Sequence, residues 1–506
     1  MSNHLYDALL APHAASERPC LHLIDGSTRT YSDMIELAAC LASVLAAHGA
    51  EVGDRVVVQV DKSPEALALV FACLHAGLVL VPLNTAYTPA EVSYFVGDAM
   101  PAVLVSDPSR SNALVEIANG VGADLLTLGG DGSGSLMTEA AAAGDDHPVA
   151  EREAGDLAAI LYTSGTTGRS KGAMLSHENL LSNTRSLAEV WRFSERDVLL
   201  HALPIFHTHG LFVAANVTLL SGGSMIFLPG FDADMVIREL PRATAIMGVP
   251  TFYTRLLARA EFDEELAGHM RLFVSGSAPL LAETHREFFD RTGHHILERY
   301  GMTETCMIAS NPYKGERRPG TVGFALPGVE LRIGEPATGK PVATGEIGVV
   351  ELTGPNVFGG YWQMPEKTAE EFRDDGFFIT GDLGQIDADG YLHIVGRGKD
   401  LIISGGFNVY PKEVETAIDD MDGIVESAVI GVPHPDFGEA VVAVVVPEPG
   451  AEIGEASIVA TLGDSLARFK LPKRVLFTDE LPRNTMGKVQ KNILRDEHAG
   501  ILEARQ

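Results

Sequence analysis

The sequence is poor in cysteine and lacks an excess of positive charge, and both shortages narrow the possible functions. Its 506 residues include only four cysteines, and no two of them form a CxxC pair. A structural zinc site or a disulfide framework is therefore not indicated. Lysine and arginine number 38 against 68 aspartate and glutamate residues, which gives a net charge of −30. A protein this acidic is not expected to bind nucleic acid or an anionic membrane.

Long apolar runs are also missing. The first twenty residues lack the basic start and the apolar stretch of a signal peptide. The most apolar region, residues 211–228, is interrupted by Asn216 and by the pair Gly222 and Gly223. We therefore expect a buried strand and helix there, not a membrane span. These features predict a cytoplasmic protein with no membrane partner.

The composition that remains, 46% hydrophobic and 21% charged, is typical of a globular chain long enough for two or three domains. The first half alternates helical patterns, as over 31–48, with short apolar strands, as over 55–60. Later, short strands with Gly and Asp turns predominate. The sequence predicts an α/β fold with a large N-terminal domain (1–396) that has largely parallel sheets and a β-rich subdomain. A hinge (397–400) and a small, mobile α+β domain (401–506) follow.

The most informative motif is residues 163–172, TSGTTGRSKG, which follow an apolar strand-like stretch. Glycines let backbone N–H groups approach an anion closely, and the hydroxyls and the ammonium of Lys171 add donors. The run is not a Walker A loop, because Lys171 does not directly follow a glycine. It indicates a polyphosphate site, and a polar surface turn is the alternative.

Three further motifs are ambiguous one by one. Glu304, flanked by two threonines, suits Mg²⁺ beside phosphate oxygens, or it belongs to a capped helix start. Asp382 suits the hydroxyls of a ribose, with Arg397 as a second contact, or it shapes a turn. Lys488 ends a loop rich in proline and glycine, where a lysine can enter and leave a site or simply remain on the surface.

Three histidines cluster at His201, His207 and His209. The cysteine or glutamate partners expected at zinc-site spacings are missing around them. We interpret them as residues that line a pocket, with a zinc site as the less favoured alternative.

Together, and in this order along nearly the whole chain, these motifs resemble the adenylate-forming enzymes, which include acyl-CoA synthetases, peptide-synthetase adenylation domains and luciferases. Within that group the chain is most similar to malonyl-CoA synthetases. The segments that carry this closer resemblance are residues 201–211, 247–253, 275–279, 284–286 and 484–488.

The resemblance implies a two-step reaction. A carboxylate, here malonate, attacks the α-phosphorus of ATP in the presence of Mg²⁺ and gives an acyl-adenylate and pyrophosphate. The thiol of coenzyme A then displaces AMP. Three alternatives stay open: a ligase for methylmalonate or another short acid, a ligase for an aryl or medium-chain acid, and a stand-alone carrier-loading adenylation enzyme.

The resemblance also implies the site residues. Lys488 would bridge the substrate carboxylate and the α-phosphate, helped by Thr303 and His207, and Glu304 would ligate Mg²⁺. Lys399 would be the hinge about which the small domain swings between the two steps, bringing loop 404–407 toward the pantetheine arm. The expected ATP-binding residues are Thr163, Ser164, Gly165, Thr166, Thr167, Gly168, Lys171, Ser277, Ala278, Glu298, Tyr300, Gly301, Asp382 and Arg397, and the expected acid-binding residues are Arg286, Ser277, His207 and Met302.

The choice of acid depends on Arg286. A bound dicarboxylate leaves one carboxylate inside the acid pocket, where it has to be paired, and the fork of an arginine matches a carboxylate in a bidentate manner. The sequence alone favours a solvated ion pair of Arg286 with Glu283 or Asp290 on the same helix, and it is the resemblance to malonyl-CoA synthetases that implies the acid-binding role. We also expect that a protein lysine acetyltransferase acting on Lys488 would switch the enzyme off by removing the positive charge.

Overall fold

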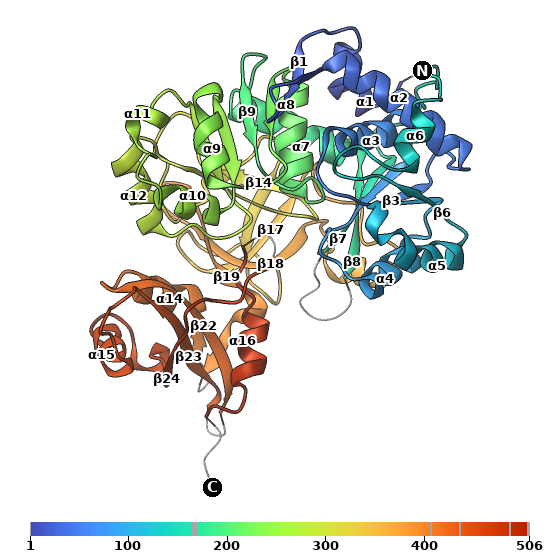
Figure 1. Ribbon diagram of the computed structural model, residues 1–506. Coiled ribbons are helices and arrows are strands. Elements are labelled where there is room, and N and C mark those ends of the chain that lie inside the picture. The colour runs from blue at the N-terminus through green and yellow to red at the C-terminus, as the bar shows by residue number, and fades with distance from the viewer. Residues whose placement is uncertain (1, 164–169, 405–406, 435–436, 485–486, 503–506) are drawn as a thin grey trace.

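The computed structural model describes residues 2–163, 170–404, 407–434, 437–484 and 487–502. A large N-terminal part is followed by a smaller C-terminal part, which lies below it in Figure 1. The chain passes between them through the short 3-10 turn η5 (Gly398–Asp400). Strands and helices are mixed in both parts, so the predicted α/β fold class with a second, smaller α+β unit is confirmed.

The first sheet contains six strands in the spatial order β6-β5-β3-β4-β7-β8, all parallel except β8. Local sequence explains its helices: α3 begins where the Ser63 side chain accepts a hydrogen bond from the Ala66 N–H and where Pro64 occupies the first turn. Its elements are α2 (Tyr31–Ala47), β3 (Arg55–Gln59), α3 (Pro64–His75), β4 (Val79–Pro82), α4 (Pro89–Ala99), β5 (Val103–Ser106), α5 (Ser111–Val121), β6 (Asp124–Thr127), α6 (Ser135–Ala140), β7 (Leu157–Thr163) and β8 (Lys171–Ser176).

The second sheet contains nine strands in the order β15-β14-β13-β12-β11-β9-β10-β1-β2. Its central strands are parallel and buried on both faces, as expected for apolar strands between helices. Its strands are β1 (Pro19–His22), β2 (Thr28–Thr30), β9 (Val198–His201), β10 (Ser224–Phe227), β11 (Ala245–Gly248), β12 (Leu272–Ser275), β13 (Leu297–Met302), β14 (Cys306–Ser310) and β15 (Phe324–Ala325). Its helices are α1 (Tyr6–Leu9), α7 (His177–Val190), the π-helix η3 (His209–Ala215), α8 (Asn216–Leu220), α9 (Ala233–Glu239), α10 (Pro250–Leu257), α11 (Glu264–Ala267) and α12 (Ala282–Thr292).

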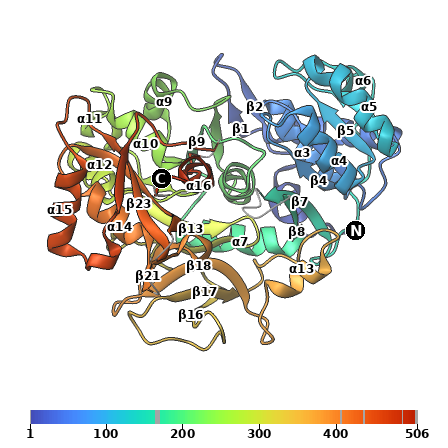
Figure 2. The same cartoon turned by 90° about the horizontal axis from the view of Figure 1, so that it is seen from below.

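A four-stranded antiparallel sheet, β16-β17-β18-β19, forms the β-rich part that the sequence predicted. Its strands β17, β18 and β19 lie between the N-terminal sheets and the C-terminal part in Figure 1, and the sheet lies at the lower edge of Figure 2. Its elements are β16 (Glu330–Gly334), β17 (Gly348–Thr353), α13 (Pro365–Glu370), β18 (Phe378–Ile386) and β19 (Leu392–Arg397).

The C-terminal part has its own sheet and its own apolar cores, one on each face of that sheet. Val414 and Ile458 belong to the core under α14 and α15, and Leu494 of α16 belongs to the core on the other side. Its elements are β20 (Ile402–Ser404), β21 (Phe407–Val409), α14 (Pro411–Asp419), β22 (Ile424–His434), β23 (Gly438–Pro447), α15 (Glu455–Ser465), β24 (Arg474–Phe477) and α16 (Lys491–His498).

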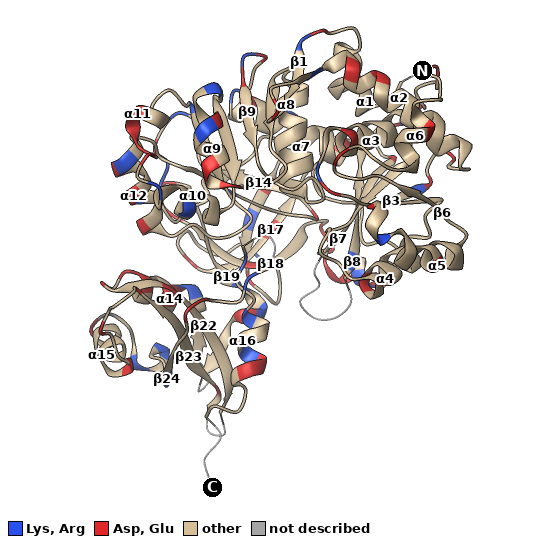
Figure 3. Cartoon of the chain, in the orientation of Figure 1, with Lys and Arg blue, Asp and Glu red and all other residues tan. Residues whose placement is uncertain are grey.

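Acidic and basic residues are intermingled over most elements, as Figure 3 shows. An anionic ligand therefore has to be held by local groups, because the net charge of the protein opposes it. Within the described ranges, no helix combines the length and the apolar character needed to cross a bilayer.

Candidate active site

Both ends of the predicted phosphate loop lie on one antiparallel strand pair. Thr163 ends β7, Lys171 begins β8, and the two residues face each other across the pair. Helix α4 supports the far end, because the hydroxyl of Tyr94 donates to the carbonyl of Ser170 at 2.7 Å. The loop residues Ser164, Gly165, Thr166, Thr167 and Gly168 lie outside the described residues.

Lys171 and Glu304 both contact one tyrosine, Tyr361, the first at its ring and the second at its hydroxyl. The Lys171 Nζ is 4.0 Å from the centre of the Tyr361 ring and 3.2 Å from the Glu371 carboxylate. The Tyr361 hydroxyl donates to the Glu304 carboxylate at 2.9 Å. Two residues 133 positions apart in the sequence, a loop lysine and a carboxylate, are thus brought into one electrostatic neighbourhood.

Glu304 sits in the turn between β13 and β14, so this motif is a strand hairpin and not a capped helix start. The residue is 6% exposed, and burial raises the pKa of its carboxyl group, while Tyr361, Lys171 and Arg397 oppose that rise. One buried carboxylate beside a phosphate loop fits Mg²⁺, which prefers one or two carboxylates together with phosphate oxygens.

Asp382 joins two other predicted ATP-binding residues. Its Oδ2 accepts from the Tyr300 hydroxyl at 2.5 Å, and its Oδ1 lies 2.7 Å from the Arg397 Nε. Asp382 lies within β18 directly opposite Arg397 of β19, so it is part of a strand pair and does not merely shape a turn. Burial and the nearby Asp382 charge raise the pKa of Tyr300 well above its usual range, so this hydroxyl remains a donor. A carboxylate held in this way is suited to accept the hydroxyls of a ribose.

Strand β13 carries most of the remaining residues predicted for the nucleotide. Glu298 is buried, which raises the pKa of its carboxyl group, and it lies 3.2 Å from the His285 Nδ1. Gly301 and Met302 end the strand, Thr303 opens the turn that follows, and Ala278 comes after β12 on the neighbouring strand.

A second group of polar residues surrounds the loop after β12. Ser277 adopts a left-handed backbone conformation, with φ of +69°, which is rare for a residue with a side chain and marks local strain. Its Oγ lies 3.2 Å from the His209 ring Nδ1. The main-chain N–H of His209 in turn donates to the ring Nδ1 of His207 at 3.3 Å. Burial, and then the charge of Arg299, lower the pKa of His207 to about 4 and that of His209 well below its usual range. Both rings are therefore neutral at pH 7.

The group contains a buried arginine that the sequence did not predict as a site residue. Arg299 is 5% exposed, and its Nε and Nη2 have no hydrogen-bond partner among the described residues. Burial lowers the pKa of its guanidinium to about 9, so it remains charged at neutral pH. A buried charge without a partner is costly, and the arrangement therefore favours an anionic ligand.

Strand alternation explains why the motifs did not indicate Arg299 as an acid-binding residue. Glu298 and Tyr300 were both predicted to contact the nucleotide, and successive residues of a strand point to opposite faces. Arg299, between them on β13, therefore faces the other way, toward Gly276 and the histidines. The available signal was a second charged residue directly after Glu298, two positions beyond the buried pair Ile296 and Leu297.

Gly276 leaves room for this guanidinium. A Cβ added at Gly276 would lie 2.3 Å from the Arg299 Cζ. We expect Gly276→Ala to displace Arg299 and to lower kcat/KM for an acid bound there by roughly tenfold or more. Steady-state kinetics would measure this, with Gly230→Ala as the control, because a Cβ at Gly230 meets nothing within 4 Å. Equal activity of the two variants would contradict the assigned position.

The structure does not bring Arg286 to this group, and the expectation for this residue has to be corrected. Its side chain is 62% exposed, and its Nη2 lies 3.5 Å from the Asp420 carboxylate of the C-terminal part. The physical reason is that Arg286 lies on a face of α12 directed away from the buried residues Thr284 and His285. Its ion pair is formed with Asp420, not with Glu283 or Asp290 of its own helix.

A partly buried lysine, Lys62, supports the histidine segment. The Lys62 Nζ lies 2.8 Å from the His201 Nδ1 and 2.7 Å from the His201 carbonyl oxygen. The His201 Nε2 is 2.8 Å from the Gly210 carbonyl, so Nε2 carries the proton and Nδ1 accepts from Lys62. The histidines therefore have protein partners, which favours the pocket-lining interpretation over zinc. No local signal in the sequence links Lys62 to His201, 139 residues away.

Lys488 lies on the side of the C-terminal part that faces the nucleotide residues. A Cβ at the neighbouring Gly487 would be 3.3 Å from the Thr251 Oγ1 of α10, so this loop contacts the large part. Partial desolvation and the charge of Arg397 lower the pKa of Lys488, and Asp382 opposes this. Lys399, predicted as the hinge, lies in η5, and burial lowers its pKa to about 8.

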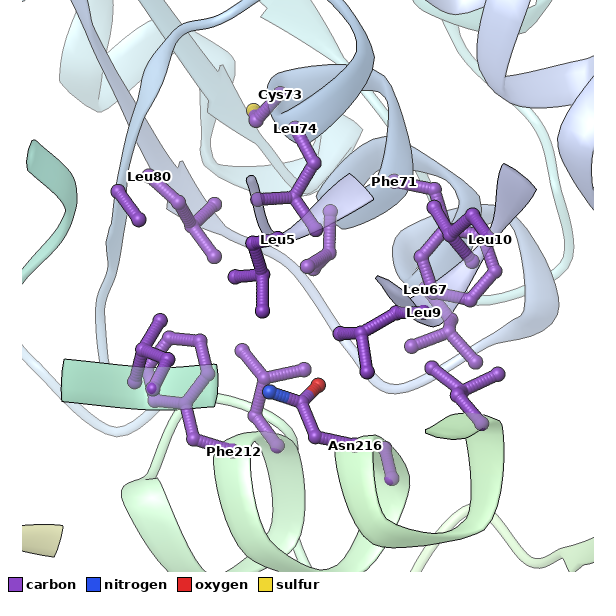
Figure 4. Close-up of a pocket in the computed structure, with 16 residues that line it drawn as sticks. Leu5, Leu9, Leu10, Leu67, Phe71, Cys73, Leu74, Leu80, Phe212 and Asn216 are labelled. Atoms are coloured by element: carbon purple, nitrogen blue, oxygen red, sulfur yellow. The ribbon is translucent and has the colours of Figure 1, made fainter. Parts of the chain in front are cut away.

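An enclosed pocket elsewhere in the N-terminal part is apolar and is not suited to this chemistry. Figure 4 shows leucines and Phe71 around it, together with Asn216 and Phe212. None of its lining residues carries a charge, so it offers nothing that would hold an anion.

Comparison with known proteins identifies the family to which the chain belongs. Residues 11–362 match the AMP-binding enzyme family, and residues 413–488 match the AMP-binding enzyme C-terminal domain. The chain belongs to the AMP-binding enzymes. The family resemblance inferred from the motifs is thereby confirmed.

Among AMP-binding enzymes, the chain is 58% identical to MatB from Rhodopseudomonas palustris, over 99% of this chain and 100% of that one. The TM-score is 0.98 with the ATP-bound structure of MatB and 0.87 with the apo structure. The chain is 37% identical to a malonate–CoA ligase of Arabidopsis thaliana, covering 88% of this chain and 78% of that protein. It is also 37% identical to a feruloyl-CoA synthase of an Amycolatopsis species, covering 96% of both chains.

Proposed function

We propose that this AMP-binding enzyme joins malonate to coenzyme A. In the first step malonate and ATP give malonyl-adenylate and pyrophosphate, and in the second the thiol of coenzyme A gives malonyl-CoA and AMP. The observation that carries the choice of a dicarboxylate is the buried guanidinium of Arg299, whose Nε and Nη2 find no partner among the described residues, beside Ser277 and His207. The similarity to the Arabidopsis malonate–CoA ligase supports the same substrate.

In this proposal Arg299 pairs the distal carboxylate of malonate. Its free Nε and Nη2 offer the two parallel donors that a carboxylate accepts. The neutral imidazole of His207 adds a hydrogen bond without an additional charge. Ser277 and Met302 would shape the rest of the acid pocket, so Arg299 takes the role that the sequence had suggested for Arg286.

The nucleotide would be held by groups that are already preorganised. Asp382, with Arg397, would accept the ribose, and Glu298, Tyr300 and Gly301 with Ala278 would line the adenine pocket. Lys171 and the loop that begins at Thr163 would hold the β- and γ-phosphates. Mg²⁺ on Glu304 would neutralise phosphate charge.

Lys488 would act where the two anions meet. The attacking carboxylate and the α-phosphate repel each other, and a cation placed between them offsets that repulsion most as charge shifts in the transition state. Thr303 would contact the same phosphate. Lys488 lies within electrostatic reach of Arg397 and Asp382, which supports its presence on the nucleotide side during adenylate formation.

The second step would need a different orientation of residues 401–506 relative to residues 1–396. We place the hinge at 397–400, with Lys399 as the residue that absorbs the rotation. Lys488 would then leave, and the loop that ends at Phe407 would approach the pantetheine arm. Residues 405–406 of that loop lie outside the described part of the chain.

The Lys488 charge is also a point at which the enzyme could be regulated. The side chain is exposed to solvent, so a protein lysine acetyltransferase has access to it. Acetylation would remove the cation from the first step, and we infer that it would switch the enzyme off.

A panel of acids tests the function. We expect AMP formation that depends on both ATP and coenzyme A, with kcat/KM for malonate roughly 100-fold above that for acetate, butyrate or ferulate, because those acids leave Arg299 unpaired. Comparable use of ferulate and malonate would contradict the proposal. Methylmalonate, other short acids, and a carrier protein in place of coenzyme A are the remaining arms of the assay.

A further inference from the structure

Lys171 of the phosphate loop has a protein counter-ion. Its Nζ lies 3.2 Å from the Glu371 Oε1, and the side chains of Lys171 and Glu371 are only 20% and 23% exposed. The tyrosine ring of residue 361 lies against the same ammonium at 4.0 Å. The cation that is assigned to the phosphates therefore has a carboxylate partner within the protein itself.

Main-chain hydrogen bonds hold the backbone of Glu371 in place. It caps α13, with its N–H donating to the Thr368 carbonyl at 3.1 Å and its carbonyl accepting from the Ile379 N–H at 2.8 Å. The segment before α13 is joined to β8, because the Trp362 N–H donates to the Gly172 carbonyl at 2.7 Å. These hydrogen bonds thus fix the main chain of Glu371 relative to β8, which begins at Lys171.

Glu371 also has a second cation. The Lys367 Nζ lies 3.1 Å from the same Glu371 oxygen that Lys171 contacts. When Lys171 turns to another anion, Glu371 therefore keeps a partner and is not left as an isolated, partly buried charge. This lowers the cost of exchanging one partner of Lys171 for another.

We propose that Glu371 is an exchangeable counter-ion, which holds Lys171 ready before ATP binds and competes with phosphate for it afterwards. Because this carboxylate competes for Lys171, the loop binds ATP and the pyrophosphate product less tightly. Glu371 is thus a positioning residue that lowers the affinity for the nucleotide and thereby speeds the release of pyrophosphate. The inference rests on the ATP-binding role of Lys171 and goes beyond it.

Equilibrium titration calorimetry with ATP and Mg²⁺, without acid or coenzyme A, tests this proposal because no reaction can follow. We expect Glu371→Gln to lower the Kd for ATP, and for pyrophosphate, by roughly threefold or more at low salt, with the gain shrinking as salt is added. Glu370→Gln is the matched control: it removes the same charge one residue away, from a side chain that pairs with Lys367.

A double-mutant cycle separates this role from a structural one. In a Lys171→Met background, Glu371→Gln should no longer change the Kd, because the cation for which it competes is gone. An unchanged or higher Kd in Glu371→Gln, an equal gain in Glu370→Gln, or a gain that persists with Lys171→Met would each overturn the proposal. Failure of the unmodified protein to bind ATP would instead overturn the proposed function.

Discussion

Arg299→Met is expected to lower kcat/KM for malonate by roughly 100- to 1,000-fold, because the distal carboxylate would be buried without its partner. The side chain lies in a buried site with two free donors, and methionine keeps much of its apolar volume while removing the charge. Steady-state AMP formation with malonate would measure the loss. The same variant should use butyrate better than the unmodified enzyme does, since no buried cation then faces the alkyl chain.

Arg286→Met is the matched control for this experiment. It removes an arginine that is 62% exposed and whose ion-pair partner among the described residues is the similarly exposed Asp420, so we expect little change in kcat/KM for malonate. ATP binding should be unchanged in both variants, which would show that both fold. If Arg286→Met lost malonate activity while Arg299→Met kept it, the assignment made from burial would be wrong.

Lys488→Ala is expected to slow malonyl-adenylate formation by about 100- to 1,000-fold and to spare thioester formation from supplied malonyl-adenylate. The first half-reaction loses the cation between two anions, whereas the second no longer needs it. Pyrophosphate exchange measures the first step, and single-turnover reaction of malonyl-adenylate with coenzyme A measures the second.

Two further variants complete this test. Lys488→Gln mimics acetylation and should behave like Lys488→Ala, whereas Lys473→Gln, which changes an exposed lysine of the same part of the chain, should behave like the unmodified enzyme. Equal loss of both half-reactions in Lys488→Ala would speak against two working orientations. Full activity of Lys488→Gln would speak against regulation by acetylation.

Most helices and strands followed from local sequence. The helix predicted over 31–48 is α2, and the strand predicted over 55–60 is β3, because apolar periodicity and capping residues act within a few positions of one another. Motif order predicted the family for the same reason: each motif is one short loop or turn. The alternatives for Glu304 and Asp382 could be decided only when their neighbouring strands were known.

The sequence by itself determined the fold class and the family, and it predicted the residues of the nucleotide site that lie within recognisable motifs. Only the tertiary structure decided which arginine is buried, since Arg299 owes its burial to β12 and the histidine segment, and Arg286 its exposure to the outer face of α12. The same holds for Lys171 and Glu371, which are 200 residues apart in the sequence. Burial and pairing are properties of packed surfaces, and distant segments create those surfaces only when the chain folds.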